Sequence, residues 1–564
     1  MSDTCTEEMA PSESVSLPSE KNRVRTILTW YWAELIVVGL AIALWLPRLS
    51  GPIDLRWDAG VYYVLGTSLA TGHGYRILSE PGAPQALQYP PLLPAIVAAY
   101  EKALGSADAA VVGPWLRISY AILFLMYGLA ALTLAKRYLS PVLAFGATAL
   151  CLLHFETIFL SDLLFTELPF ALVSVAFALV TVNGTPASRL RGVASYALAA
   201  AGFLLRTAGV VLLAAWILEA LRRRRWRLVI WRSVLALLPI IAWQAHVLRV
   251  RASDEYVHPA YQYQRASYQY YNVSYAENAR LIDPFHPELG KMSSAAFVWR
   301  LATNLPKVAF ALGEAVSTRE LEWRLIVQHL QRRILKRPIL PGAVAIVPIL
   351  GLAALVLGGL LLLIRKHAWT MVFIILGSVA LVLTTPWPAQ FNRYLMPLEA
   401  FLSICVFMAL SQIATSLQRR DAWASNLARG GLIGVVALMF GTASYAALMQ
   451  FYYRAKPEGT VIGENTASYH LFAHDRSWQD WEEAAAWIDT QTPRNAIVAT
   501  SAPHFLYLRT GRLAVLPPME SDPVRARLLL ESVPVSYVLV DNWEFLDLSR
   551  RYARPAMELS LIHI

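Results

Sequence analysis

Long apolar segments recur along most of the chain, and they constrain its fold more than any other feature. Hydrophobic residues make up 56% of the 564 residues and charged residues only 16%, which is too few charges for a soluble protein of this size. Segments of about twenty apolar residues are typical of helices that cross a bilayer. We therefore expect a mainly α, polytopic membrane protein, with spans near residues 28–46, 111–135, 142–160, 163–182, 228–247, 339–364, 369–385, 395–417 and 432–451.

Segment 192–221 is too long for one span. At 1.5 Å per residue a helix of this length would measure about 45 Å, whereas the hydrocarbon core is about 30 Å thick. The segment also carries Arg206 near its middle, in Leu205-Arg206-Thr207-Ala208-Gly209. Two short spans with Arg206 at their outer turn fit better, and the predicted total is then about eleven spans.

Basic residues set the orientation of these spans. They cluster near residues 136–137, 189–191, 222–227, 365–366 and 419–429, always on the side of the N-terminal tail. Positive loops stay in the cytoplasm, and such scattered clusters do not suit nucleic acid, despite a net charge of +10. We expect a multi-pass protein of the inner or plasma membrane, with a disordered cytoplasmic tail (residues 1–27) and extracytoplasmic loops 48–110 and 248–338.

Residues 452–564 read as a small extracytoplasmic α/β domain. The segment 478–489 has a helical pattern, and 496–500 and 535–540 are apolar runs typical of strands. The turn Thr510-Gly511-Arg512 separates the two runs. The three cysteines lie in the tail and in apolar segments, which indicates neither a disulfide framework nor a cysteine metal site.

The stretch Arg56-Trp57-Asp58-Ala59-Gly60-Val61-Tyr62-Tyr63 follows the first span and places a carboxylate among aromatic rings. A carboxylate just outside a membrane can act as a general base or bind a metal, and the rings offer stacking faces to a sugar or lipid head. The alternative is that Asp58-Ala59-Gly60 only forms a turn. Further on, Tyr89-Pro90-Pro91 opens a short apolar stretch, 92–100, that should lie along the interface.

Other ionisable residues recur at the outer ends of spans, where they are costly and often functional. Asp162 and Glu167 are candidates for a substrate pocket, although both could instead cap and solvate a helix start. His154 and Glu156 could join Asp58 in a divalent-metal site, and an ion-free site is the open alternative.

Arg206 and Arg393 are the natural partners of an anionic ligand. A guanidinium at the interface is suited to grip a lipid phosphate by two hydrogen bonds, and the alternative is that each snorkels to water or headgroups. The Tyr-rich segment, residues 256–275, could be an interfacial belt or a ligand surface. No Gly-rich phosphate loop, nucleophile elbow or zinc-binding helix motif is present in the sequence.

These motifs together resemble GT-C fold membrane glycosyltransferases, particularly the aminoarabinose-transferase and protein-mannosyltransferase type. The resemblance covers about residues 28–451 and rests on the Asp58 stretch, Tyr89-Pro90-Pro91-Leu92, Asp162-Leu163-Leu164-Phe165-Thr166-Glu167, the Arg206 break and Asn392-Arg393-Tyr394-Leu395-Met396-Pro397. It implies inverting transfer of a sugar from a polyprenyl-phosphate donor to a lipid, glycan or protein acceptor at the outer face. Asp58 would be the base, Arg393 and Arg206 would bind the donor phosphate, and the substrate pocket would include Trp57, Tyr62, Tyr63, Tyr89, Asp162, Glu167 and Tyr394.

Two positions depart from the pattern. Many relatives have two adjacent acidic residues where this chain has Asp58-Ala59, which bears on any metal requirement. Some have a basic residue before the Pro-Pro pair where this chain has Gln88-Tyr89, which leaves the phosphate to Arg393 and Arg206.

The main rival is a secondary transporter or flippase of lipid-linked sugars. It would need broken helices at matching positions of two related halves, and the sequence has no such repeat. A non-catalytic envelope protein would leave Asp58 without a role.

Overall fold

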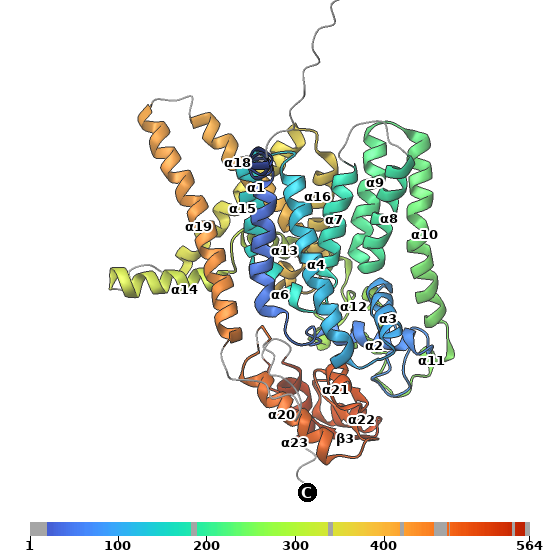
Figure 1. Cartoon of the computed structure of the whole chain (residues 1–564). Coiled ribbons are helices and arrows are strands. Elements are labelled where there is room, and N and C mark those ends of the chain that lie inside the picture. Colours follow the sequence, from blue (N-terminus) through green and yellow to red (C-terminus); the bar gives the residue numbers. More distant parts are fainter. Residues whose placement is uncertain are drawn as a thin grey trace, which may run out of the picture.

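A bundle of long helices makes up most of the molecule, and a small domain lies at one end of it (Figure 1). The computed structural model describes residues 20–181, 189–336, 342–417, 422–455, 471–472, 474–543 and 547–558. Residues 1–19 of the expected tail lie outside this part. Residues 20–27 belong to the first helix and not to a disordered tail.

The bundle helices follow the apolar segments of the sequence. They are α1 (Glu20–Trp45), α4 (Ala109–Ala135), α5 (Pro141–Leu153), α6 (Phe155–Asp162), α7 (Glu167–Thr181), α8 (Arg189–Leu205), α9 (Val210–Arg222), α10 (Trp226–Arg251), α15 (Ile346–Arg365), α16 (Trp369–Thr384), α17 (Phe391–Leu395), α18 (Glu399–Leu417) and α19 (Ala422–Ala455). Local signals set their ends. The Asp108 side chain accepts a hydrogen bond from the Ala110 N–H at the start of α4, and Pro141 occupies the first turn of α5.

Six helices of the described chain are long and apolar enough to cross a bilayer, or up to seven if α5 and α6, bent by 52°, form one span. The helices α7 and α16 are apolar but shorter. The polytopic helical architecture is thus confirmed. The expected count of about eleven spans is not confirmed.

The predicted break at Arg206 is present. Residues Thr207–Gly209 form a short 3₁₀ turn, η2, and α8 and α9 pack side by side on either side of it (Figure 1). Gly209 allows this approach, because a Cβ there would lie 2.2 Å from the carbonyl carbon of Gly202. Arg206 therefore sits at the tip of a helical hairpin.

The segments that were expected to be outer loops are more helical than expected. Asp58 begins a helix, α2 (Asp58–Ala70), which packs on α3 (Leu92–Leu104). Segment 248–338 was expected to be a loop, yet it contains α13, which packs against α15 and α16. The helices of this segment are α11 (Asp254–Val257), α12 (Tyr275–Asn278), α13 (Ser294–Glu314) and α14 (Glu320–Leu330). Short turns complete the membrane part: η1 (Leu46–Arg48), η3 (Pro287–Leu289), η4 (Gln331–Leu335), η5 (Gly342–Ala345), η6 (Pro388–Gln390) and η7 (Met396–Leu398).

The C-terminal domain has the expected α/β pattern. Its elements are α20 (Arg476–Gln491), β1 (Ile497–Ala499), α21 (Pro503–Thr510), β2 (Ala514–Val515), α22 (Pro523–Glu531), β3 (Val535–Val538), η8 (Ser549–Ala553) and α23 (Arg554–Glu558). The strands form a parallel sheet in the order β2-β1-β3. Gly511 ends α21 with a φ of 69°, which suits a residue without a Cβ.

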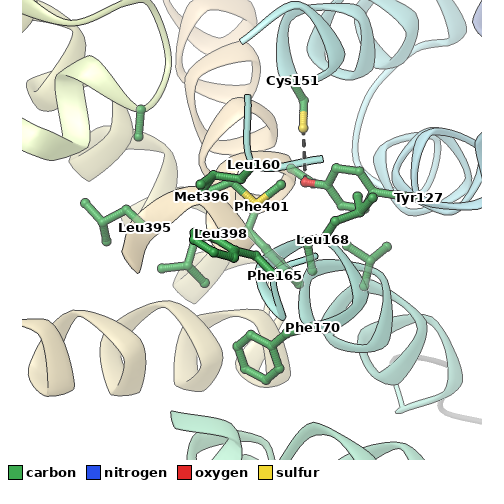
Figure 2. Close-up of a cluster of buried hydrophobic side chains, with 14 of the residues drawn as sticks. Tyr127, Cys151, Leu160, Phe165, Leu168, Phe170, Leu395, Met396, Leu398 and Phe401 are labelled. Atoms are coloured by element: carbon green, nitrogen blue, oxygen red, sulfur yellow. Dashed lines mark hydrogen bonds between the residues drawn. The ribbon is translucent and has the colours of Figure 1, made fainter. Parts of the chain in front are cut away.

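A buried hydrophobic cluster fills the centre of the bundle. Figure 2 shows it between α4, α5, α6, α7 and the segment that leads into α18, with Tyr127 and Cys151 joined by a hydrogen bond of 3.1 Å. Leu160 and Phe165 belong to this cluster and also line the cavity described below. One wall of that cavity therefore rests on close-packed side chains.

Candidate active site

A cavity of about 590 Å³ lies where the bundle meets the C-terminal domain. Its lining combines residues from the start of α2, the segment before α3, α6, the hairpin tip at Arg206, the Tyr-rich segment, α17 and the segment after β1. A concave site of this size between two parts of a protein is typical of ligand binding. Among the predicted site residues, it is lined by Trp57, Asp58, Tyr62, Tyr89, Glu156, Arg206, Arg393 and Tyr394.

Four charged side chains form a continuous chain at this cavity. Arg393 donates from Nη2 to Asp58 Oδ2 at 2.7 Å and from Nε to Glu167 Oε1 at 2.6 Å. Arg206 Nη1 lies 2.7 Å from the same Glu167 oxygen. Two carboxylates thus balance two guanidinium groups, and each charge has an opposite charge beside it.

Burial differs along the chain of charges. The Glu167 side chain is fully buried, whereas those of Asp58, Arg393 and Arg206 are 18%, 20% and 17% exposed. Glu167 does not line the cavity, but it holds both arginines at the wall. The Arg393 guanidinium also lies 4.3 Å from the centre of the Phe165 ring.

The backbone before Asp58 is strained. Trp57 has φ 56° and ψ −134°, which L-residues rarely adopt. Contacts hold it there: its ring makes edge contacts with Phe159 and Trp478 at 5.9 and 5.4 Å, and the Arg56 guanidinium lies 4.6 Å from it. This conformation places Asp58 in the first turn of α2, beside the cavity.

Tyrosines form the wall next to Asp58. Tyr271 donates a long hydrogen bond, 3.4 Å, to Asp58 Oδ1, and the Tyr62 and Tyr89 rings pack at 4.8 Å. Burial, and to a smaller extent the charge of Asp58, raises the pKa of the Tyr89 hydroxyl well above its usual value. Burial likewise raises the pKa of Tyr271. Both hydroxyls stay protonated and able to donate at neutral pH.

Two predicted pocket residues lie away from the cavity. Asp162 Oδ1 is buried with two arginines, 3.3 Å from Arg117 Nη1 and 3.9 Å from Arg48 Nη1. The Tyr63 hydroxyl donates to the Ala107 carbonyl at 3.0 Å. Neither is among the residues lining the cavity. Asp162 holds η1, α4 and α6 together and is not placed to contact a ligand there.

The structure does not assemble the predicted metal site. His154 Nδ1 pairs with Glu399 Oε1 at 2.5 Å, while Glu156 Oε1 accepts from Arg319 Nε at 2.8 Å. Asp58 in turn forms an ion pair with Arg393. No group of three His, Cys, Asp or Glu side chains in the described ranges is placed to hold a metal ion. These residues therefore do not fit a metal in this arrangement.

The sequence analysis named no residue of the C-terminal domain as part of the site. Ser501, His504 and Phe505 follow β1, and together with Trp543 they line the cavity opposite the bundle. A usable signal was present, because ligands of parallel sheets bind outside the carboxyl ends of the strands. The order of the strands, which shows that β1 is central, could not be read from the sequence.

Comparison with known proteins identifies the fold. No protein-family model matches the sequence, and no curated protein matches it. The fold is similar to that of the Archaeoglobus fulgidus oligosaccharyltransferase in its apo form, with TM-score 0.52, 13% identity, and coverage of 90% of this chain and 69% of that one. The oligosaccharyltransferase AglB from the same organism, in complex with an inhibitory peptide and a dolichol-phosphate, gives TM-score 0.51, 13% identity, and coverage of 91% and 69%.

A lower similarity is found to ArnT from Cupriavidus metallidurans in the apo state, with TM-score 0.47, 13% identity, and coverage of 87% of this chain and 86% of that one. The expected GT-C fold is confirmed by the similarity to the two oligosaccharyltransferase structures. At such low identity the likeness concerns the fold alone.

Proposed function

We propose that this chain, which has the GT-C fold, is a membrane glycosyltransferase that moves a sugar from a polyprenyl-phosphate donor to an acceptor at the extracytoplasmic face. The observation that carries the proposal is the Asp58–Arg393–Glu167–Arg206 chain of charges beside a cavity. It supplies a carboxylate and two guanidinium groups within one site, which is what a displacement at a sugar phosphate needs.

The proposed reaction is a single displacement with inversion. Asp58 takes the proton of an acceptor hydroxyl or amine as that atom attacks the anomeric carbon of the sugar. The bond from this carbon to the phosphate oxygen breaks, and its electron pair leaves with the polyprenyl phosphate. Arg393 and Arg206 hold the departing phosphate, and the rings of Trp57, Tyr62, Tyr89 and Tyr394 pack against the sugar and lipid head.

Donor binding and activation of the base are coupled in this scheme. Asp58 is paired with Arg393 in the structure, so its lone pairs on Oδ2 are engaged. A donor phosphate would compete with Asp58 for the Arg393 guanidinium, while the buried Glu167 keeps the arginine in place. Asp58 would then be released as a base only when the donor is bound.

The proposed partners are a polyprenyl-phosphate sugar, a lipid, glycan or protein acceptor, and the lipids of the inner or plasma membrane. The C-terminal domain and the Tyr-rich segment form the acceptor side in this proposal, because residues of both line the cavity.

Reconstitution tests the proposal. The purified full-length protein, in vesicles that contain labelled polyprenyl-phosphate sugars, is incubated with an extract of envelope lipids, glycans and proteins. We expect label in the acceptor fraction, and free polyprenyl phosphate in equal amount. Movement of the labelled lipid across the bilayer without transfer would instead indicate a transporter. Neither transfer nor movement with any donor tried would count against both functions.

A further inference from the structure

The C-terminal domain presents the carboxyl edge of its sheet to the cavity. The chain leaves β1 for β2 on one side and later returns to β3 on the other, so a crevice forms outside the carboxyl end of β1. The segment that follows β1 carries Ser501 and His504, and both line the cavity. In open parallel sheets such a crevice is the usual place for a ligand.

His504 is held in this crevice by one ring nitrogen only. The residue is 2% exposed, and its Nδ1 lies 2.7 Å from Ser79 Oγ in the first outer loop. Its Nε2 is buried and has no hydrogen-bond partner within the described chain. A buried polar atom without a partner costs free energy, which a bound ligand would recover.

His504 also lies close to the proposed base. Its ring packs at 4.6 Å against Tyr271, whose hydroxyl donates to Asp58 Oδ1. Its Cβ would be 3.2 Å from a Cβ placed on Gly60, in the first turn of α2. Arg393 binds the other oxygen of Asp58, Oδ2. The two oxygens of Asp58 thus separate a side with guanidinium groups from a side with Tyr271 and His504.

The chemistry of the imidazole selects the kind of group it can bind. Burial lowers the pKa of His504 to about 3, so the ring is neutral at physiological pH. A neutral ring offers one hydrogen bond and no charge. A neutral ring therefore suits a hydroxyl, amine or amide as its partner, and it has no charge with which to attract a phosphate.

We propose that His504 is an acceptor-binding residue: its Nε2 hydrogen-bonds an uncharged polar group of the sugar acceptor and holds the nucleophile on the Oδ1 side of Asp58. This inference rests on the proposed glycosyltransferase function and deepens it. The C-terminal domain then contributes to the acceptor site directly and does not only cover the cavity.

Two substitutions separate the two nitrogens of the ring. His504→Asn places an amide near the Nδ1 position, so it can keep the contact with Ser79 but cannot reach the acceptor. His504→Gln extends to the Nε2 position and can restore the acceptor contact. In the reconstituted assay the rate is measured against acceptor extract at saturating donor, and against donor at saturating extract.

We expect His504→Asn to raise the half-saturating amount of acceptor extract by roughly threefold to tenfold, as loss of one uncharged hydrogen bond implies, with donor half-saturation unchanged. His504→Gln should recover most of this loss. An unchanged acceptor dependence, or a shift in donor half-saturation instead, would overturn the proposal.

A second measurement works on the wild-type protein without turnover. Diethyl pyrocarbonate modifies neutral imidazole nitrogens, and mass spectrometry reports the modification of His504. We expect protection by the acceptor extract and none by polyprenyl phosphate alone. Equal modification with and without the extract contradicts the acceptor contact. If the wild type transfers no sugar with any donor, the glycosyltransferase proposal fails, and protection still decides whether His504 binds an envelope compound.

Discussion

Arg393 contacts two carboxylates whose surroundings differ. Glu167 is fully buried and has Arg206 as a second partner, whereas Asp58 is partly exposed to the cavity. Breaking the ion pairs of Glu167 with its two arginines would leave its buried charge uncompensated, which is costly. Asp58 can change partner at a lower cost, because water and Tyr271 remain available to it. Of the two, Asp58 is therefore the carboxylate that a donor phosphate displaces.

Asp58→Asn should separate the roles of charge and shape. The amide oxygen can still accept from Arg393, so the fold should be nearly intact, but the proton acceptor is gone and the neutral amide competes less well with the donor phosphate. We expect turnover to fall by about 10²-fold or more, measured as initial rate in the reconstituted assay, with polyprenyl-phosphate binding equal to or tighter than that of the wild type. Normal turnover in a folded variant would exclude Asp58 as the base. Glu156 would then be tested next, because it also lines the cavity.

Arg393→Ala should act on the donor. Loss of a charge-assisted contact to a phosphate costs about 1.5–3 kcal/mol, so binding of polyprenyl phosphate in nanodiscs should weaken roughly 10- to 150-fold. Arg393→Lys keeps the charge but lacks the planar guanidinium that reaches Glu167 and Asp58 together. Its affinity for polyprenyl phosphate should therefore lie between those of the wild type and Arg393→Ala. Equal binding by wild type and Arg393→Ala would remove Arg393 from the phosphate site.

Glu80 allows a prediction about pH. Tyr261 and Asn272 donate to its Oε2 at 3.0 and 2.7 Å, while Oε1 has no hydrogen-bond partner in the part of the chain that is described. Burial raises the pKa of Glu80 from 4.5 to about 6. The folded state therefore binds the proton more tightly, and the resulting stabilisation, complete below pH 4.5, is lost as the pH rises through 6.

Glu80→Gln should remove this pH dependence. The amide oxygen can keep both hydrogen bonds, and the NH₂ group takes the position of Oε1. At pH 7 we expect the free energy of unfolding to rise by about 2 kcal/mol, since a shift of one pKa unit corresponds to about 1.4 kcal/mol. At pH 4 wild type and variant should be equal. Denaturant unfolding across this pH range measures the difference, and parallel curves would show that Glu80 is not the titrating group.

Individual residues show what sequence can and cannot predict about a site. Asp58, Arg206 and Arg393 stood out because each interrupts or borders an apolar segment at its outer end. Asp162 gave the same local signal, but Arg48 and Arg117 reach it from two other helices and make it structural. Nothing in the sequence singled out His504 within the segment after β1, because its place at the cavity depends on a domain contact.

At the scale of elements, the α8–α9 hairpin positions Arg206. Gly209→Ala would push a methyl group against the backbone of Gly202 and Phe203, at 2.2 to 2.3 Å. We expect the hairpin to open, with a loss of about 1–3 kcal/mol in stability and weaker donor binding as Arg206 shifts. Thermal unfolding and polyprenyl-phosphate binding measure the two effects.

Gly192→Ala is the matched control in the same hairpin. A Cβ there would meet no described atom within 4 Å, and alanine is favoured over glycine in a helix by about 1 kcal/mol. Its stability should be equal or higher and its binding unchanged. Similar behaviour of both variants would mean that the close approach at Gly209 does not position Arg206.

Hydropathy predicted the bundle helices well because long apolar runs have few alternatives in a bilayer. It failed for α13, whose run is interrupted by Arg300, Pro306 and Lys307. In the structure the Arg300 guanidinium is bound by the carbonyl oxygens of Leu281 and Ile282, at 2.6 and 3.0 Å. Packing of α13 and the hydrogen bonds from Arg300 to distant backbone carbonyls thus offset the cost of burying the polar residues that had indicated a loop.

At the scale of the whole molecule, the C-terminal domain and the Asp58 stretch form one unit. The buried Arg56 guanidinium donates to Asp54 Oδ2 at 2.7 Å and to the Phe472 carbonyl at 2.5 Å, and it lies 4.9 Å from the Trp478 ring. These partners are up to 416 residues apart in sequence. The sequence predicted the α/β pattern of the C-terminal residues, but contacts over such separations leave no local pattern from which docking could be inferred.

The orientation of the molecule in the membrane yields the last prediction. The α8–α9 hairpin returns the chain to the side on which it started, and α9 meets α10 at the end of the bundle opposite the C-terminal domain (Figure 1). The basic run 222–227 lies at that end, and such runs are retained in the cytoplasm. The cavity, at the other end, should therefore open outside.

Arg225 and Gln491 are both exposed, one at each end. In a variant with Cys5→Ser, and with Cys151 and Cys405 left buried, we introduce Arg225→Cys or Gln491→Cys into the full-length protein. A membrane-impermeant maleimide should label Gln491→Cys in intact spheroplasts and Arg225→Cys only after lysis. Labelling of both positions from the same side would contradict the hairpin, and labelling in the opposite pattern would place the proposed site in the cytoplasm, where the donor scheme above does not apply.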